Sequence, residues 1–97
     1  MENALVPELS VSDWLQSRLF YCDLIGFSVL YERPEEGFCY LDLDGAQLMI
    51  DQIGIGRDFG IDGAPLEKPF GRGLNLQIRV PDVHAILGRL ASAGREP

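Results

Sequence analysis

Side chains suited to contacting a ligand recur at alternate positions on both sides of a turn within residues 38–51. They comprise two aromatic residues, two carboxylates, an amide and a thioether: Phe38, Tyr40, Asp42, Gln47, Met49 and Asp51. Apolar contact area interrupted by a few polar groups is typical of the wall of a ligand site. Glu8, predicted on the same side of another strand, would make with Asp51 a carboxylate pair for proton transfer. Solvated surface carboxylates are commoner, so the pattern favours binding over catalysis.

A predicted β-hairpin positions these side chains, with its turn at Asp44-Gly45. Asp-Gly between alternating apolar runs indicates a type I′ turn, because both central residues need positive φ. A two-residue turn pairs Leu43 with Ala46 next to it, and Phe38 with Asp51 at the far end. The opposite face is then uniformly apolar and must pack against something such as a helix; it carries Cys39, Leu41, Leu43, Ala46, Leu48 and Ile50.

Little other catalytic chemistry is available. His84 is the lone histidine and follows a predicted helix N-cap at Pro81-Asp82, where a half-exposed surface role is commoner than metal ligation or base catalysis. No Ser-His-Asp or Cys-His set can be assembled without it. Cys22 and Cys39 are predicted to be buried free thiols rather than a disulfide.

Composition narrows the class of partner. A chain of 97 residues with 46% hydrophobic and 24% charged residues is predicted to form one globular domain. The net charge is -7, the pI is about 4.4, and the eight basic residues are spread singly, which argues against nucleic-acid binding. A cationic or neutral partner fits better. Because the sequence has no apolar run long enough to span a membrane and no signal-peptide pattern, we expect a cytoplasmic protein with no membrane partner.

Hydrophobic periodicity predicts a β-α-β-β-β module over residues 1–52. A strand over 5–11 is followed by a helix that is capped by Ser12 or Asp13 and ends at Gly26. A second strand then places Phe27, Val29 and Tyr31 on one face, before the turn at 34–37 leads into the hairpin.

The rest of the chain is predicted to be a linker and the start of a second module. Residues 53–73 are rich in Gly and Pro and have no clear periodicity. Residues 74–97 are predicted to form a strand over 74–80 and a helix with Val83, Ile86, Leu87 and Leu90 as its buried stripe. The polar side of the strand carries Asn75, Gln77 and Arg79, which we assign to the ligand-binding face with the hairpin residues and Glu8. The alternative is the water-exposed face of a half-covered antiparallel sheet.

The two modules share a pattern, since Leu9-Ser-Val-Ser-Asp13 corresponds to Ile78-Arg-Val-Pro-Asp82. This repeat, together with residues 19–27, 35–40 and 75–83, resembles the vicinal oxygen chelate superfamily. That superfamily includes glyoxalases, extradiol dioxygenases and bleomycin-resistance proteins, and the chain looks most like the last. The resemblance implies an α+β fold with a cupped, mostly antiparallel sheet, helices on its outer face and a ligand inside. Here the second module stops after its helix.

Function and assembly follow from the same resemblance. Metal enzymes of this superfamily place ligands at positions that match Val6, Asn75 and approximately Met49, which are poor donors for hard or borderline metals. No metal or other cofactor is therefore expected. The resemblance implies non-catalytic sequestration of a flat, aromatic, cationic molecule such as a bleomycin-type antibiotic, with Phe38 stacking on its rings. The alternatives are a divergent metal-dependent glyoxalase- or dioxygenase-like enzyme, and a ligand-free interaction module or remnant. The resemblance also implies a homodimer. Because the second module is incomplete, we expect the two chains to be intertwined.

Overall fold

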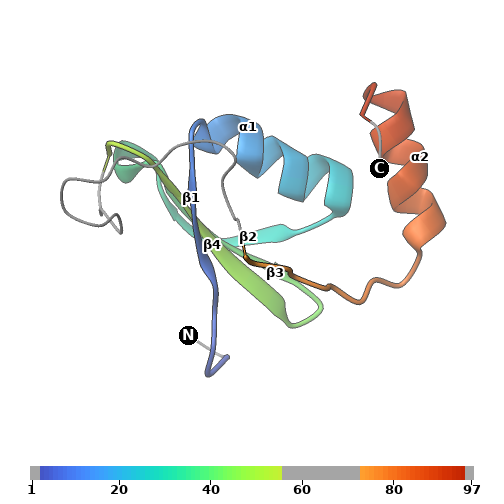
Figure 1. Ribbon diagram of the computed structural model, residues 1–97, viewed down its shortest axis with the longest axis horizontal. Coiled ribbons are helices and arrows are strands. Elements are labelled where there is room, and N and C mark those ends of the chain that lie inside the picture. Colours follow the sequence, from blue (N-terminus) through green and yellow to red (C-terminus); the bar gives the residue numbers. More distant parts are fainter. Residues whose placement is uncertain (1–2, 56–72, 96–97) are drawn as a thin grey trace.

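The computed structural model describes residues 3–55 and 73–95. They form an open mixed sheet with the first helix packed on one face, and the second helix lies beside the end of the first (Figure 1). The elements of the first module are β1 (Glu8–Val11), α1 (Trp14–Leu19), a π-helical stretch η1 (Phe20–Ile25), β2 (Ser28–Arg33), a short 3₁₀ turn η2 (Pro34–Glu36), β3 (Phe38–Leu43) and β4 (Ala46–Gln52). The second predicted module contributes α2 (Val83–Ser92). This confirms an α+β fold with a partial second module. The predicted linker, residues 53–73, lies largely outside the described residues.

The sheet has the strand order β1-β4-β3-β2. β1 runs parallel to β4, while β3 is antiparallel to both β4 and β2. The hairpin register is confirmed pair for pair, from Leu43 opposite Ala46 to Phe38 opposite Asp51. Asp44 and Gly45 have φ of 50° and 93°, so both central residues adopt the positive φ that the predicted turn requires.

The apolar face of the hairpin forms the main core, under α1 and η1. Cys39, Leu41 and Ile50 are fully buried and pack with Trp14, Phe27 and Leu48. The predicted cap is confirmed, because the Asp13 carboxylate accepts a hydrogen bond from the Gln16 backbone amide at 3.3 Å. The predicted stop at Gly26 is also confirmed, with φ of 113°. The last turns widen to π geometry, and Leu15 and Leu19 are exposed rather than packed in the core.

One face assignment in β2 is wrong. A β-bulge between Val29 and Tyr31 inserts Leu30 as an extra residue, so Val29 lies opposite Leu41 while Tyr31 lies opposite Tyr40. Because an extra residue reverses the alternation beyond it, Tyr31 moves to the face away from α1. Arg33, which lies opposite Phe38, shares that face.

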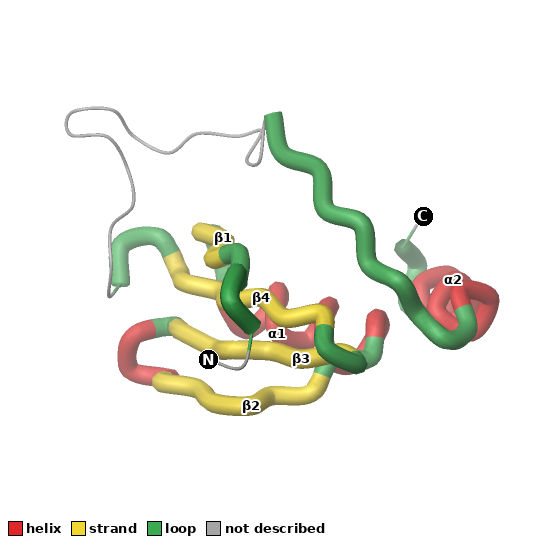
Figure 2. The backbone as a smooth tube through the Cα atoms, turned by 90° about the horizontal axis from the view of Figure 1, so that it is seen from below, coloured by secondary structure: helices red, strands yellow, loops and turns green. Residues whose placement is uncertain are grey.

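The predicted strand over residues 74–80 is absent from the structure. This segment is extended and lies apart from the sheet in Figure 2, and Leu74 and Leu76 are 55% and 41% exposed. A strand needs a neighbour to complete its hydrogen bonds, and no described strand pairs with it. Only Ile78 and Val80 pack against buried clusters.

The predicted second helix is present, and its cap is the Asp82 carboxylate, which accepts from the Ala85 backbone amide at 3.1 Å. Its contact with the module is narrower than predicted: Ile86 and Leu90 are buried against Leu24, whereas Val83 and Leu87 are exposed. Arg89 adds two hydrogen bonds to backbone carbonyls at the end of η1, 2.8 Å to Leu24 and 3.2 Å to Ile25. Neither helix in the described ranges is long and apolar enough to cross a membrane.

Candidate functional site

The candidate site is the sheet face opposite α1, which we call the open face. The register brings seven of the predicted residues onto it from three adjacent strands. In β1 and β4, Glu8 lies opposite Met49 and Ser10 lies opposite Asp51. In β3 and β4, the same face carries three pairs: Phe38 with Asp51, Tyr40 with Met49, and Asp42 with Gln47.

A chain of hydrogen bonds fixes the polar side chains near the hairpin turn. The Tyr40 hydroxyl donates to Gln47 Oε1, and Gln47 Nε2 donates to Asp42 Oδ1 at 3.0 Å. Gln47 is only 7% exposed, so its amide serves mainly to orient its two neighbours. The phenol ring of Tyr40 is thereby held in one position on the open face, as a preorganised contact surface requires.

Asp51 is the unusual group of the open face. Its side chain is 3% exposed, and its Oδ2 atom has no hydrogen-bond partner among the residues that the structure describes. Buried carboxylate oxygens are normally paired, because an unsatisfied acceptor costs free energy. Phe38 and Ser10 are its neighbours across the sheet on either side. The combination offers a hydrogen-bond acceptor beside an aromatic ring.

The aromatic end of the open face contains two residues that sequence analysis missed. The rings of Tyr31 and Phe38 lie 6.2 Å apart, centroid to centroid, in an edge-on arrangement at 63°. The Arg33 guanidinium lies 5.1 Å from the Tyr31 centroid and 5.9 Å from that of Phe38. Arg33 Nε also donates to the Tyr31 hydroxyl at 2.5 Å, and Nη1 donates to Glu36 Oε2 at 3.2 Å. These hydrogen bonds raise the pKa of Arg33, so it stays charged.

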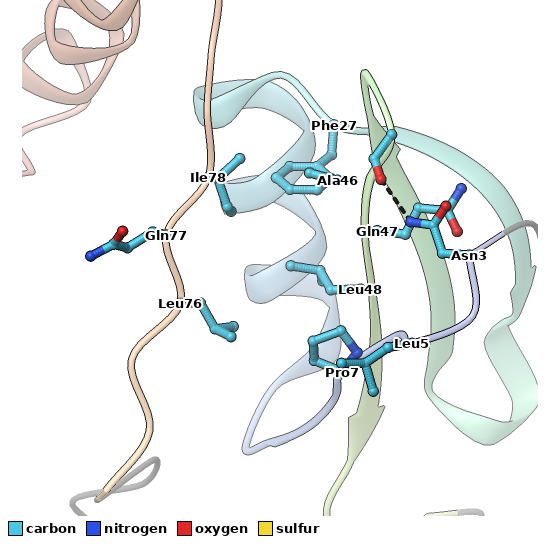
Figure 3. Close-up of a pocket in the computed structure, with 11 residues that line it drawn as sticks. Asn3, Leu5, Pro7, Phe27, Ala46, Gln47, Leu48, Leu76, Gln77 and Ile78 are labelled. Carbon is cyan, nitrogen blue, oxygen red and sulfur yellow. Dashed lines mark hydrogen bonds between the residues drawn. The ribbon is translucent and has the colours of Figure 1, made fainter.

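The three predicted site residues in the second module do not join the open face. Asn75, Gln77 and Arg79 are exposed on the extended segment. Gln77 lies at the edge of a cleft of about 240 Å³ between this segment and the start of β4, but in Figure 3 its amide points away from the cleft. Leu76 and Ile78 point into it, toward Phe27 and Leu48. Ligand contact by the three polar residues stays a prediction.

Neither cysteine is an activated nucleophile. Cys22 and Cys39 are both free thiols, as predicted. Burial raises the pKa of the Cys39 thiol to about 11 and also raises that of Cys22. His84 is exposed on α2, as predicted. The open face therefore offers contacts and hydrogen bonds rather than a thiolate or an imidazole.

Solved structures with a similar fold identify the family. A glyoxalase/bleomycin resistance/dioxygenase superfamily member from Vibrio splendidus 12B01 is 39% identical, over 91% of this chain and 66% of that chain, with a TM-score of 0.50. The chain belongs to this superfamily. No protein-family model and no curated protein matches the sequence.

Two other solved structures share the fold. TnmS3, an antibiotic binding protein from Streptomyces sp. CB03234, is 26% identical over 97% of this chain and 74% of that one, with a TM-score of 0.55. An integron cassette protein from the mobile metagenome of the Halifax Harbour sewage outfall shares the fold at 14% identity and a TM-score of 0.54, with 97% and 72% covered. The chain thus spans about two thirds to three quarters of these similar structures.

The metal site of the superfamily's enzymes does not fit this chain. Of the matching positions that fall within this chain, one is Val6, whose side chain has no donor atom, and another is approximately Met49, whose thioether is a soft ligand unsuited to hard or borderline metals. Asn75, the third, lies on the separate extended segment. Within residues 3–55 and 73–95, no three His, Cys, Asp or Glu side chains gather as metal ligands would. We therefore derive no metal-dependent step.

Proposed function

We propose that the protein binds and sequesters a flat, aromatic, cationic small molecule on its open face, without chemical conversion. The observation that carries this proposal is the buried Asp51 Oδ2, which has no hydrogen-bond partner in the described residues and lies beside Phe38. A ligand with a donor or a cationic group next to a flat ring system would satisfy both features. Stacking on an aromatic side chain contributes about 0.5 to 1.5 kcal/mol beyond the area buried.

The overall charge supports a cationic ligand. The chain has a net charge of -7, and Glu8 and Asp42 add carboxylates to the open face beside Asp51. A negative field concentrates cations at the surface and speeds their association. TnmS3, an antibiotic binding protein, provides a precedent for small-molecule binding on this fold. A bleomycin-type antibiotic is accordingly our first candidate ligand.

Calorimetric titration with bleomycin, with and without Cu(II), tests the proposal. Calorimetry is preferable to tryptophan fluorescence, because Trp14 is the only tryptophan and packs from α1 into the core on the opposite side of the sheet. We expect saturable binding that weakens by about tenfold or more in Asp51→Asn, as loss of a charge-assisted contact implies. Asp44→Asn in the exposed turn removes the same charge elsewhere and should leave binding unchanged. No heat of binding at high micromolar ligand from a folded sample would exclude bleomycin.

We further propose that the working form is a homodimer, with an intertwined exchange of modules as the arrangement we favour. Among the residues that the structure describes, no strand pairs with the outer edge of β1 or with the extended segment around Leu74 and Leu76, so both offer backbone groups, and the segment also offers exposed apolar side chains, to a second copy. A dimer would cover both. Light scattering over a dilution series should give twice the monomer mass at micromolar concentration; a folded monomer throughout would exclude the dimer.

The same exposed surface favours one alternative function, a module that binds another polypeptide. Leu5, Leu74 and Leu76 are 83%, 55% and 41% exposed. Exposed apolar side chains that gather in one patch often mark a protein–protein interface. This alternative predicts that another polypeptide binds tightly, that Leu76→Ser abolishes this binding, and that bleomycin gives no heat of binding. We also propose the cytoplasm as the location, because the sequence shows neither a membrane-spanning apolar run nor a signal-peptide pattern.

A further inference from the structure

Arg33 lies where a cationic aromatic ligand would stack. Its guanidinium carbon is within 6 Å of two ring centroids, at 5.1 Å from Tyr31 and 5.9 Å from Phe38, which is the range of a cation–π contact. The bulge at Leu30 creates this arrangement, because it turns Tyr31 onto the open face beside Phe38. The aromatic end of the site thus already holds a flat cation, supplied by the chain itself.

The contacts that hold Arg33 are suited to exchange. Its side chain is 47% exposed, and that of Glu36, its ion-pair partner, is 43% exposed. Exposed ion pairs and cation–π contacts are weak, and the guanidinium regains water when it leaves. Phe38, in contrast, is only 8% exposed and stays in place as a platform. The Phe38 ring is therefore held in place, while the Arg33 guanidinium that lies against it can exchange with a ligand.

We infer that Arg33 is an internal competitor that lies against the Tyr31 and Phe38 rings in the free protein, and that a flat ligand binds by displacing it. This inference rests on the proposed function and adds a specificity-determining residue to it. Arg33 sets a threshold: a ligand must interact with the rings and with Asp51 more favourably than the guanidinium and its Glu36 partner do. Cations that stack only weakly on the rings would not displace Arg33 and would therefore not bind.

The test uses two flat tricyclic probes, proflavine, which is cationic at neutral pH, and acridine, which is neutral there. Calorimetric titration of wild type and Arg33→Gln should show that both probes bind about two- to fivefold more tightly to the variant, the size expected for removing an exposed cation–π competitor. Arg18→Gln is the matched control. Arg18 pairs with Glu32 at 2.9 Å, on the helix side of the sheet, and its loss removes the same charge without uncovering the Tyr31 and Phe38 rings.

Two comparisons separate displacement from simple charge repulsion. Repulsion predicts tighter binding of proflavine only, whereas displacement predicts tighter binding of acridine as well. Arg33→Lys keeps the charge but loses the planar guanidinium, so displacement predicts affinities between those of wild type and Arg33→Gln. An acridine affinity that is equal in wild type and Arg33→Gln would overturn the inference and leave the proposed function standing.

A measurement without ligand tests the occupied state by itself. Ring currents should shift the side-chain protons of Arg33 upfield in the free protein, and Phe38→Leu should reduce that shift while Tyr31, the nearer ring, retains the larger part of it. Unshifted Arg33 protons in wild type would overturn the inference whatever the probes do. If Arg33 is stacked but neither probe nor bleomycin binds any variant that unfolds cooperatively, the proposed function fails, and displacement fails with it.

Discussion

Replacing Asp51 by Asn should raise the stability of the free protein while weakening its ligand binding. The carboxylate is 3% exposed, and Oδ2 has no hydrogen-bond partner in the described part of the chain. Leaving a buried polar group unsatisfied costs about 1 to 3 kcal/mol, and more when it is charged. Asn has nearly the same size and no charge but keeps a polar amide, so we expect a gain near the lower end, about 1 kcal/mol.

Thermal unfolding followed by circular dichroism measures this change. In a domain of this size, about 1 kcal/mol corresponds to a rise in Tm of about 4 to 8 °C. Asp44→Asn is the control, because Asp44 is exposed in the turn at φ of 50°, a conformation that Asn tolerates well. Its Tm should change by about 2 °C or less. A lower Tm for Asp51→Asn, with Asp44→Asn unchanged, would mean that the Asp51 carboxylate stabilises the free protein, and the reasoning would be refuted.

Three further predictions concern the core and the hairpin. Leu41→Ala should lower the free energy of unfolding by about 2 to 5 kcal/mol, since Leu41 is fully buried. Leu30 is 49% exposed, so the control Leu30→Ala should lower it by less than about 1 kcal/mol. Equal losses for the two variants in urea titrations would refute the assigned core. Phe38→Ala should weaken ligand binding and also cost about 3 kcal/mol of stability, because its ring is 8% exposed; a fully stable variant would show that the ring is not packed. The pKa of Cys39 is raised from 9.0 to about 11, so the folded state retains the proton more strongly, and this stabilisation is present below about pH 9 and lost as pH rises to about 11. The loss amounts to about 2 to 3 kcal/mol, and Cys39→Ala should unfold in urea with a shallower pH dependence across that window; an unchanged slope would contradict the assignment.

The hairpin could be predicted in full because its determinants are local. Asp44-Gly45 sets the turn and the two-residue alternation sets both faces, so each pair from Leu43–Ala46 to Phe38–Asp51 is as expected. The faces of β2 were wrong because they were counted forward from Phe27 through the bulge at Leu30. Counting backward from the turn at 34–37 places Arg33 opposite Phe38 and Tyr31 opposite Tyr40. This count from the turn would have placed both Tyr31 and Arg33, the two missed residues, on the open face.

Two other features depend on tertiary context that local pattern does not contain. The segment over 74–80 alternates as a strand should, yet it is unpaired because a strand also needs a neighbouring backbone. The sequence could place Asp51 on the open face but not show that it is 3% exposed with an unsatisfied oxygen, since burial depends on the surrounding elements. The same holds for Phe38: the sequence placed its ring on the open face but did not show that the ring is only 8% exposed.

Methyl NMR during titration with metal-free bleomycin tests most directly whether the open face is the ligand site. Met49 and Leu48 are consecutive in β4, but Met49 belongs to the open face and Leu48, at 3% exposed, belongs to the core under α1. We predict that the Met49 methyl signal shifts saturably, with the affinity measured by calorimetry, while the Leu48 methyl signals stay in place. Saturable shifts at Leu48 with Met49 unchanged would contradict the account and place the ligand on the other side of the sheet.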